Sequence, residues 1–429
     1  MRSIVKNPKL AAEGKKELAW ARANMPILAR IRARFQKEKP LKGLTIGVCL
    51  HLEKKTGILL ETLAAGGAAV AAASCNPLTT DDRVAAALAL HPRIAVFAWA
   101  GQTSKQYYDN ISRVLDFHPS IVIDDGMDQI SLLHTKRRDA LPGMIGGCEE
   151  TTTGVIRLQA MHAAGKLAFP VYAVNNAYSK FLFDNRFGTG QSTVDAVMRA
   201  TNKLIAGKTA VVVGFGSCGR GIAERLRGLG ANVIVVEAAG RRAEGSPSGY
   251  HKALEALYSG FRVMPLEEAA PQGDLFITAT GDKHVITGKH FARMKDGALL
   301  ANAGHFNIEI DEPSLRRMSR RVDEVKENVA CYTLKDGRRL YLLSEGRLVN
   351  LARPSGQGHP IEIMDGSFAI QALCAERLAT GERQKPGVLD VPNWIDDEVA
   401  RLALESQGVT LKPLTREQER YLREWREGT

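Results

Sequence analysis

The sequence has few cysteines, and they form no recognisable motif. The six cysteines are Cys49, Cys75, Cys148, Cys218, Cys331 and Cys374. They lie far apart, include no C-x-x-C pair and have no histidine partners at the spacing of a metal site. The sequence therefore predicts free thiols in a reducing compartment and no bound metal.

A segment that could enter a membrane is also missing. Charged residues recur from Arg2 through Lys16, so the N-terminus has no apolar signal-peptide core. The most apolar stretch, Ile58 to Cys75, contains Glu61 and two adjacent glycines, which leave it too short and too interrupted to cross a bilayer. We expect a cytoplasmic protein with no membrane partner.

The chain lacks a long basic arm, although its net charge is +11. The basic residues are scattered, with only short clusters such as Lys136–Arg138 and Arg241–Arg242, and basic and aromatic residues do not alternate. This pattern is typical of a solvated basic surface and argues against a nucleic-acid partner. The sequence contains no internal repeat and no low-complexity segment.

The composition and length are those of a globular protein with more than one domain. The chain has 429 residues, of which 45% are hydrophobic and 24% charged, so we expect two or three domains that each bury a core. Short apolar runs alternate with helical patterns: strands are predicted at 44–50, 69–74, 93–99, 121–123 and 169–174, and helices at 15–23, 27–35, 55–66 and 104–116. Such alternation predicts an α/β fold with parallel sheets.

The segment from Lys208 to Glu237 has the pattern of a dinucleotide-binding β-α-β unit. An apolar run leads into Gly214, Gly216 and Gly219, a helical pattern follows, and a second apolar run ends on Glu237. The glycines allow a tight turn and close approach of a pyrophosphate to the helix N-terminus, while the acid suits the ribose hydroxyls of NAD. An ordinary glycine turn is the alternative, but all parts of the unit are in register, so we predict bound NAD.

Further strands are predicted at 261–264, 274–278 and 298–301, followed by a hairpin at 330–334 and 339–343. Residues 352–358 are glycine-rich and resemble a hinge, and helices are predicted at 367–378 and 416–426. We therefore predict two Rossmann-like domains with parallel sheets: a substrate domain at 1–185, completed by 351–400, and an NAD-binding domain at 186–350. A short C-terminal helical tail would occupy 401–429.

Three predicted strands of the first unit end on polar residues. His51 follows the first of them, Asp124 and Asp125 end another, and Asn175 and Asn176 follow a third. A single ending of this kind is usually a cap or an Asx turn. Three of them at the carboxyl edge of a parallel sheet predict a site, because ligands bind beyond that edge.

Two further segments carry candidate chemistry. Glu149 and Glu150 precede three threonines and a helical pattern, which exceeds the needs of a helix cap. Lys180 lies four residues before Asp184, either as a surface ion pair or, if the aromatics Phe181, Phe183 and Phe187 bury it, as a lysine with a perturbed pKa that acts as a base.

These motifs together resemble the S-adenosyl-L-homocysteine hydrolase family, over nearly the whole chain. The motifs that carry the resemblance are His51, Asp124–Gly126, Glu149–Gly154, Lys180 with Phe183–Asn185, Gly304–Phe306 and Glu345–Asn350. The resemblance implies an enzyme that keeps NAD bound and recycles it in each turnover. It would oxidise the 3′-hydroxyl of the nucleoside, eliminate homocysteine, add water at C5′ and reduce the ketone again.

The resemblance also implies roles for individual residues. The catalytic residues would be Lys180, Asp184, Asn185, His51 and Asp125. The substrate would contact Glu53, Lys55, Thr56, Glu150, His305 and His359. The cofactor would contact Thr151, Thr152, Thr153, Gly214, Gly216, Ser217, Cys218, Gly219, Arg220, Gly221, Glu237, Thr280, Ala303, Gly304 and Asn350.

The chain departs from the common family pattern at the nucleobase. After His51 the family usually has a small hydroxyl residue and then a glutamate that accepts from the adenine amino group, whereas this chain has Glu53 and Lys55. Lysine only donates, so it suits the O6 atom of hypoxanthine and favours the S-inosyl-L-homocysteine branch. Alternatively, Lys55 points to solvent and Glu53 alone serves adenine. We predict adenine, with hypoxanthine as the alternative.

The chain also ends soon after Leu422, without the tail that supplies a lysine and a tyrosine to the NAD of a neighbouring subunit in other members. Arg241 and Arg242 would suit a 2′-phosphate, but Glu237 would repel it, so NAD remains the prediction. A homotetramer is implied by the resemblance alone. The rival hypotheses are an NAD-dependent 2-hydroxyacid dehydrogenase and a non-catalytic regulatory relative that binds NAD and a partner protein.

Overall fold

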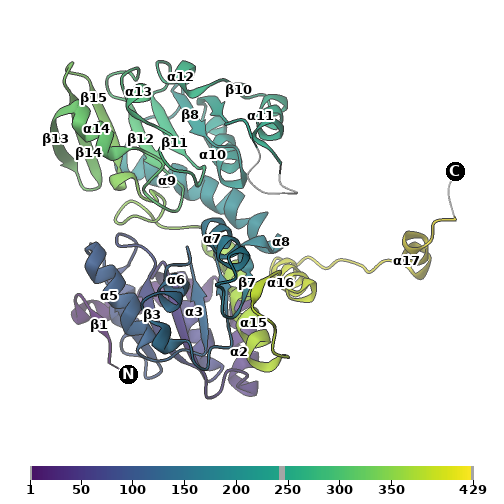
Figure 1. The fold of residues 1–429 in the computed structure, drawn as a ribbon. Helices are drawn as coiled ribbons and strands as arrows, with labels where there is room; N and C mark the ends of the chain where they lie inside the picture. The colour runs from purple at the N-terminus through teal and green to yellow at the C-terminus, as the bar shows by residue number, and fades with distance from the viewer. Residues whose placement is uncertain (1, 241–246, 427–429) are drawn as a thin grey trace.

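The computed structural model describes residues 2–240 and 247–426, so Arg241 and Arg242 lie outside the described residues. The chain forms two α/β bodies, each built on one eight-stranded sheet, and the C-terminal helix α17 (Arg416–Arg423) stands away from both (Figure 1). The predicted α/β class with two Rossmann-like sheets is confirmed. No helix within the described ranges is long and apolar enough to cross a membrane.

The first body has a sheet in the order β1-β4-β3-β2-β5-β6-β7-β16, parallel throughout. Its strands are β1 (Ile4–Val5), β2 (Thr45–Leu50), β3 (Ala69–Ser74), β4 (Ile94–Ala98), β5 (Ile121–Asp124), β6 (Gly146–Glu149), β7 (Pro170–Ala173) and β16 (Gly387–Leu389). Helices α1 (Ala11–Ala23), α2 (Pro26–Glu38), α3 (Lys54–Ala65), α4 (Asp82–Leu88), α15 (Ile361–Thr380) and α16 (Asn393–Ser406) pack on one face. Helices α5 (Ser104–Leu115), α6 (Asp128–His134) and α7 (Thr152–Ala163) pack on the other.

The second body has the order β10-β9-β8-β11-β12-β15-β14-β13, parallel except for the antiparallel pairs β13–β14 and β14–β15. Its strands are β8 (Thr209–Val213), β9 (Asn232–Val236), β10 (Arg262–Val263), β11 (Leu275–Thr278), β12 (Leu299–Asn302), β13 (Ser319–Lys326), β14 (Val329–Leu334) and β15 (Arg339–Leu343). Helices α9 (Thr189–Thr201), α10 (Ser217–Gly228) and α11 (Gly249–Tyr258) pack on one face. Helices α12 (Leu266–Ala269), α13 (Gly288–Phe291) and α14 (Glu312–Met318) pack on the other.

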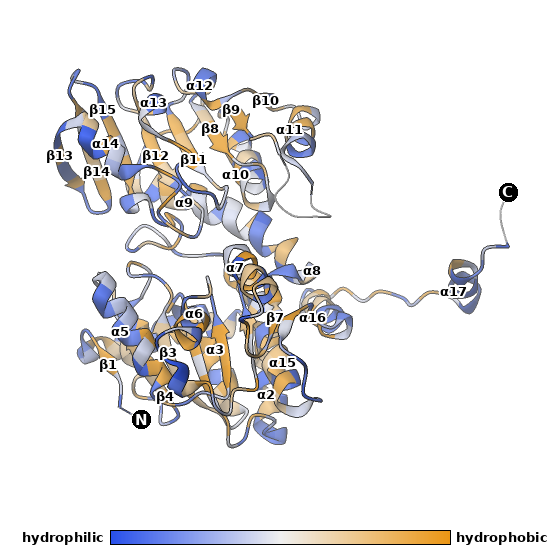
Figure 2. Cartoon of the chain, viewed as in Figure 1, coloured by the Kyte–Doolittle hydropathy of each residue, from blue (hydrophilic) through white to orange (hydrophobic). Residues whose placement is uncertain are grey.

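The strands form the cores because their sequences are continuously apolar. Figure 2 shows hydrophobic strands inside both bodies and hydrophilic residues on the outer helices. Strand β2 is buried at all but its first residue, as expected for a parallel strand covered on both faces. Short 3-10 turns at Pro8–Leu10, Arg138–Ala140, Val174–Asn176 and Ser344–Gly346 join the main elements.

The chain crosses from the first body to the second after the short helix α8 (Tyr178–Phe181), through a π-helical turn at Asp184–Gly188. It returns at residues 351–360 and enters α15. The predicted strands at 69–74 and 209–213 are confirmed, whereas α15 begins six residues earlier than predicted and α17 ends three residues earlier. Strand β6 was not predicted, because its glycines carry no strand signal. Glycine is needed there, since a Cβ on Gly146 would lie 2.7 Å from Leu378 of α15.

Each sheet reverses its strand order at one point, and both reversals face the junction of the two bodies. In the first sheet the reversal lies between β2 and β5, and in the second between β8 and β11. Parallel sheets bind ligands beyond the carboxyl ends of the strands at such points. The topology therefore directs both ligand edges toward one shared space.

Candidate active site

A cavity of about 670 Å³ lies between the two bodies. Nearly all the predicted site residues line it, and they come from both sheets. Gly219 and Gly221 are not among the residues that line it, and their contact with the cofactor stays a prediction. A Cβ on Gly219 would lie 1.8 Å from the Gly214 carbonyl oxygen, and one on Gly221 would lie 1.9 Å from that of Arg186. These two glycines allow α10 to pack closely.

His51 and Asp125 lie side by side at the point where the first sheet reverses its strand order. His51 Nε2 lies 3.3 Å from Asp125 Oδ2, and His51 Nδ1 lies 2.9 Å from Thr79 Oγ1. His305 approaches from the second body, with Nδ1 3.6 Å from Asp125 Oδ1. Burial lowers the pKa of His51 to about 4 although Asp125 opposes the shift, so the ring is neutral at physiological pH. A neutral imidazole beside a carboxylate can accept and return a proton.

Lys180 lies in a fully buried cluster of charges. Its Nζ is 3.0 Å from Asp184 Oδ2, 2.9 Å from Asn185 Oδ1 and 3.6 Å from Glu150 Oε1. Burial alone would lower the pKa of Lys180, but Asp184 and Glu150 outweigh it and raise that pKa well above its ordinary value. Lys180 is therefore an ammonium in the ligand-free chain, whereas a resting base would need a lowered pKa.

The burial of Lys180 is confirmed, but of the three aromatics expected to cover it only Phe181 is partly buried and lines the cavity. Phe183 and Phe187, which were expected to cover the lysine, are 45% and 40% exposed, whereas Lys180 and Asp184 are 4% and 2% exposed. The π-helical turn that begins at Asp184 directs the carboxylate inward. A surface ion pair is therefore excluded, and the pair lies inside the cavity wall.

Glu150 is held by a helix from the far end of the chain. Ser367 Oγ donates to Glu150 Oε1 and Gln371 Nε2 donates to Oε2, each at 2.6 Å. Both donors lie on α15, more than 200 residues away in the sequence, and no local motif indicated them. They leave the Glu150 carboxylate fixed toward Lys180.

His359 faces the Lys180 cluster. Its Nδ1 makes a very short contact with Asp184 Oδ1, and its Nε2 lies 3.3 Å from Thr189 Oγ1. Burial would raise the pKa of Asp184, but His359 and Lys180 lower it well below its usual range. Although His359 lines the cavity, its two ring nitrogens hold Asp184 and α9, so the structure gives it a positioning contact that the sequence did not predict.

The three threonines do not act as a helix cap. Thr151 stands at the N-cap of α7 without a side-chain cap bond, and its N–H is satisfied by Glu149 Oε1 at 3.0 Å. Thr152 Oγ1 donates to Asn175 Oδ1 at 3.1 Å, and Asn185 Nδ2 donates to the same atom at 3.1 Å. The threonines and the amides thus form one polar wall that continues to Lys180.

The glycine-rich turn after β8 has the shape that a dinucleotide requires. Gly214 has a φ of +97°, which favours glycine, and the space where a Cβ of Gly216 would lie is open. Glu237 directly follows β9 beside this turn and accepts from Phe215 N at 2.5 Å. Across the cavity, Asn350 Nδ2 donates to Ser192, while its buried Oδ1 has no hydrogen-bond partner among the described residues. That oxygen suits the amide of a nicotinamide, so the residues present fit NAD.

Glu309 supports the cofactor side of the cavity and was not predicted. Its carboxylate accepts from Thr280 N at 2.9 Å, Thr280 Oγ1 at 2.7 Å and Gly281 N at 2.8 Å. These bonds fix the turn after β11, at the second reversal point. The sequence offered no signal, because Glu309 lies in an irregular segment.

Lys55 is buried in the wall of the cavity rather than exposed. Its Nζ donates to the Gln357 carbonyl at 3.0 Å and lies 3.2 Å from Glu53 Oε2. Glu53 also caps α3, because its Oε1 accepts from the Lys55 and Thr56 amides. The alternative in which Lys55 points to solvent is therefore wrong, since Lys55 is 2% exposed. Donor and acceptor stand side by side at this end of the cavity.

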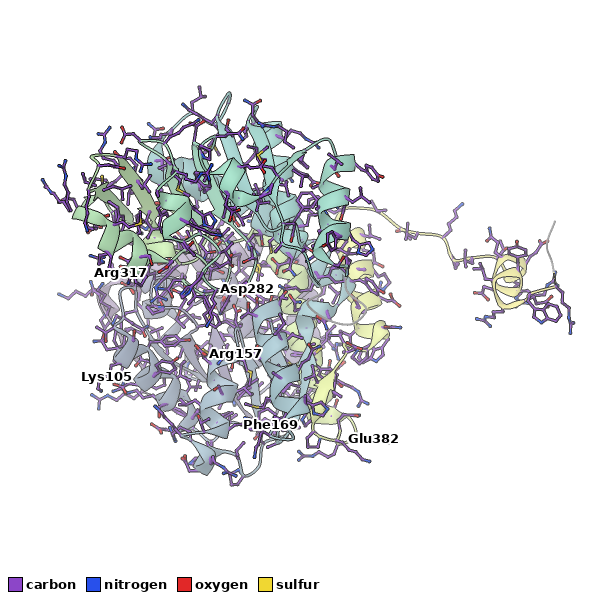
Figure 3. The ribbon with its side chains drawn as sticks, turned by 45° about the horizontal axis from the view of Figure 1, so that its top comes forward. Lys105, Arg157, Phe169, Asp282, Arg317 and Glu382 are labelled. Atoms are coloured by element: carbon purple, nitrogen blue, oxygen red, sulfur yellow. The ribbon has the colours of Figure 1, made fainter. Side chains whose placement is uncertain are left out.

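Arg157 connects the two bodies at the opposite edge. Figure 3 shows Arg157 and Asp282 at the front, where the bodies meet. The Arg157 guanidinium makes a very short hydrogen bond to the Gly126 carbonyl, pairs with Asp128 at 2.8 Å and lies 5.7 Å from the ring centroid of Phe306. Because Phe306 packs edge-on against His305, Arg157 holds the segment that brings His305 to Asp125.

Comparisons with known proteins agree with this geometry. The family profile described as S-adenosyl-L-homocysteine hydrolase matches residues 2–143, and the profile of that family's NAD-binding domain matches residues 185–356. An S-inosyl-L-homocysteine hydrolase of Methanopyrus kandleri is 55% identical, aligned over 99% of this chain and 98% of the relative. A second one, from Methanothermobacter thermautotrophicus, is 53% identical over 99% of both chains. An adenosylhomocysteinase of Pyrococcus abyssi is also 53% identical, over 99% of this chain and 98% of the relative.

Proposed function

The chain belongs to the S-adenosyl-L-homocysteine hydrolase family, and from this premise we propose which residues carry out its reaction and which nucleobase it takes. It is an NAD-dependent enzyme that hydrolyses a nucleoside thioether of homocysteine. The observation that carries the proposal is the convergence of the Lys180 cluster, the His51–Asp125 pair and the glycine-rich turn on one cavity. The Lys180 cluster would have no role in a hydroxyacid dehydrogenase.

We propose that Lys180 exchanges the proton of the 3′-hydroxyl, with Asp184 and Asn185 holding its ammonium. Bound NAD supplies reversible hydride transfer, which makes the 3′-carbon a ketone and later returns it to an alcohol. Lys180 must lose its proton before it acts as the base, and its raised pKa favours recapture of that proton, which the ammonium then returns to the same oxygen in the reduction step. Glu150, fixed by α15, would accept from the ribose hydroxyls.

His51 and Asp125 are proposed to move the protons at C4′ and C5′. The neutral imidazole can take a proton, and the adjacent carboxylate stabilises the resulting charge. A proton then goes to the departing thiolate, and one is taken from the water that adds at C5′. His305 completes this group from the second body and shields it from bulk solvent.

We propose that the purine is hypoxanthine rather than the adenine predicted from the sequence. Buried Lys55 can only donate and Glu53 accepts, and together they match the O6 acceptor and the N1–H donor of hypoxanthine. Adenine stays the alternative, with Glu53 serving its amino group. The similarity to relatives does not separate the two, because both names occur at 53% identity.

The test compares condensation of homocysteine with inosine and with adenosine on the purified enzyme. We expect faster condensation with inosine and no net release of NADH. A Lys55→Gln variant should lose at least about tenfold of its preference for inosine, since a buried charged hydrogen bond is removed. Lys54→Gln is the matched control, because Lys54 pairs with Glu17 outside this cavity. Faster condensation with adenosine would reverse the proposal, and no condensation with either nucleoside would favour a regulatory role.

Arg157 supplies a separate prediction about closure. Replacing Arg157 with methionine should raise KM for the nucleoside about tenfold, since loss of the cation–π contact and of both hydrogen bonds frees Phe306 and His305. The NAD content should not change. Arg316→Met is the control, because Arg316 lies over the Tyr332 ring and bonds Glu312 away from the cavity. Equal KM values in the Arg157 variant and the native enzyme, measured by initial rates, would contradict this role.

We further propose that the enzyme works in the cytoplasm as a homotetramer. All six cysteines are free thiols, which suits a reducing compartment. The tetramer rests on family resemblance, and light scattering of the purified protein tests it. A monomer in solution would refute the assembly.

A further inference from the structure

We infer that Thr79 is a positioning residue of the reaction: its hydroxyl fixes the tautomer of His51 in which Nδ1 carries the ring proton and Nε2 is free to take another. The inference rests on the proposed function, because it concerns the proton that His51 moves at C4′ and C5′. Thr79 is buried and does not line the cavity. No motif of the sequence indicated a role for it, because it lies in the turn between β3 and α4.

The hydrogen bonds of this turn determine which ring nitrogen carries the proton. Ser74 Oγ donates to the Asn76 carbonyl at 2.9 Å, and Thr79 Oγ1 donates to the same carbonyl at 3.2 Å. A hydroxyl has a single proton, so Thr79 Oγ1 can only accept from His51 Nδ1, which lies 2.9 Å away. The proton of the neutral ring therefore lies on Nδ1.

The other ring nitrogen keeps its lone pair for the substrate. His51 Nε2 lies 3.3 Å from Asp125 Oδ2, yet no hydrogen bond joins it to any residue that the structure describes. Burial lowers the pKa of His51 to about 4, so the ring is neutral before the reaction. Nε2 can then take the C4′ proton, and the neighbouring carboxylate stabilises the imidazolium that forms.

Contacts outside the cavity hold Thr79 in place. The Asp81 amide donates to the Leu52 carbonyl at 2.9 Å. From the segment that returns to the first body, the Arg353 amide donates to the Leu78 carbonyl at 3.1 Å, and the Arg353 guanidinium lies 3.4 Å from Asp81 Oδ2. The turn is thus tied to the segment that joins the two bodies. Outer contacts of this kind keep a catalytic side chain in its productive orientation.

The experiment replaces Thr79 with valine in the holoenzyme, which keeps the shape of the side chain but removes the acceptor. The ring proton should then move to Nε2, where Asp125 can accept it, and the base is lost. We expect kcat for condensation to fall about tenfold at unchanged KM, because a buried donor loses its partner. Oxidation at C3′ depends on Lys180 instead, so reduced nicotinamide should accumulate during turnover, measured by its near-ultraviolet absorbance.

Two further variants separate this role from a structural one. Thr79→Ser retains the hydroxyl and should return kcat to within about twofold of the native value. Thr62→Val is the matched control, because Thr62 is also buried in the first body and its hydroxyl donates to the Ile58 carbonyl within α3. It should condense at the native rate without accumulation of reduced nicotinamide.

An unchanged kcat in Thr79→Val would overturn the inference, and so would a fall in kcat without accumulation of reduced nicotinamide. If Thr79→Val does not fold, the nitrogen-15 spectrum of the native enzyme decides: the His51 signals, assigned by their absence from His51→Asn, should show the proton on Nδ1, and a proton on Nε2 would refute it. This spectrum needs no turnover, whereas condensation by the native enzyme tests the proposed function. Failure of one is therefore distinguishable from failure of the other.

Discussion

An enzyme with Lys180 replaced by methionine should lose about 1,000-fold in kcat, the scale of a positioned acid–base group. The replacement is close in volume but cannot exchange the 3′-hydroxyl proton. Oxidation is the first chemical step, so no reduced nicotinamide should build up when nucleoside is added. The measurement is a rapid-mixing record of the near-ultraviolet absorbance of reduced nicotinamide beside steady-state rates.

This variant also leaves Asp184 and Glu150 buried without their cation, which destabilises the fold. Thermal unfolding and NAD content must therefore be recorded on the same preparation. The control is Lys105→Met, which removes a lysine whose side chain is 85% exposed and pairs with Asp109 on its own helix. Rapid formation of reduced nicotinamide in the Lys180 variant would assign the base to another residue.

The second large effect is expected from one methyl group. Gly219→Ala should lower NAD affinity by at least about 2 kcal/mol, roughly a 30-fold change in Kd. The new Cβ would lie 1.8 Å from the Gly214 carbonyl oxygen, which is backbone and cannot rotate away. The glycine-rich turn must therefore move, although Gly219 does not line the cavity. Calorimetry of NAD binding to the apoenzyme measures the loss.

The same helix provides the control. Gly228 ends α10, and a Cβ there would meet no atom within 4 Å. Gly228→Ala should bind NAD as the native chain does, because it adds a methyl group to α10 without touching the turn. Unchanged NAD affinity in Gly219→Ala would show that the turn tolerates displacement and that cofactor binding does not depend on this packing.

The sequence predicted the parallel sheets well, because buried parallel strands are continuous apolar runs with clear ends. It could not predict strand β6, because Gly146 and Gly147 have low strand propensity. They occur there because a side chain would clash with α15 and the neighbouring strands. Strand β16 has only three residues and pairs with β7 across more than 200 positions. Neither feature has a local signal.

The site, like the fold, was predicted only in part. The residues of each motif were predicted, yet the groups around them were not. Lys55 is buried against Glu53 and the Gln357 carbonyl, and Phe183 and Phe187, which were expected to cover Lys180, are exposed. The position of Thr79 beside His51 depends on strand order, which periodicity does not reveal. Partners that act through tertiary structure, such as Ser367 and Glu309, became visible only in three dimensions.

The hydrogen bonds that α15 donates to Glu150 have a consequence for folding during synthesis. During synthesis on the ribosome, β6 and the buried Glu150 emerge long before Ser367 and Gln371. Until the entire cofactor body has been made, the nascent first body can pair Glu150 with Lys180 but lacks both hydrogen-bond donors of α15, so water must take their place. The wall of the cavity is complete only when the last quarter of the polypeptide packs back onto the first body. A chain released before that point would carry the motifs of the enzyme without a complete cavity.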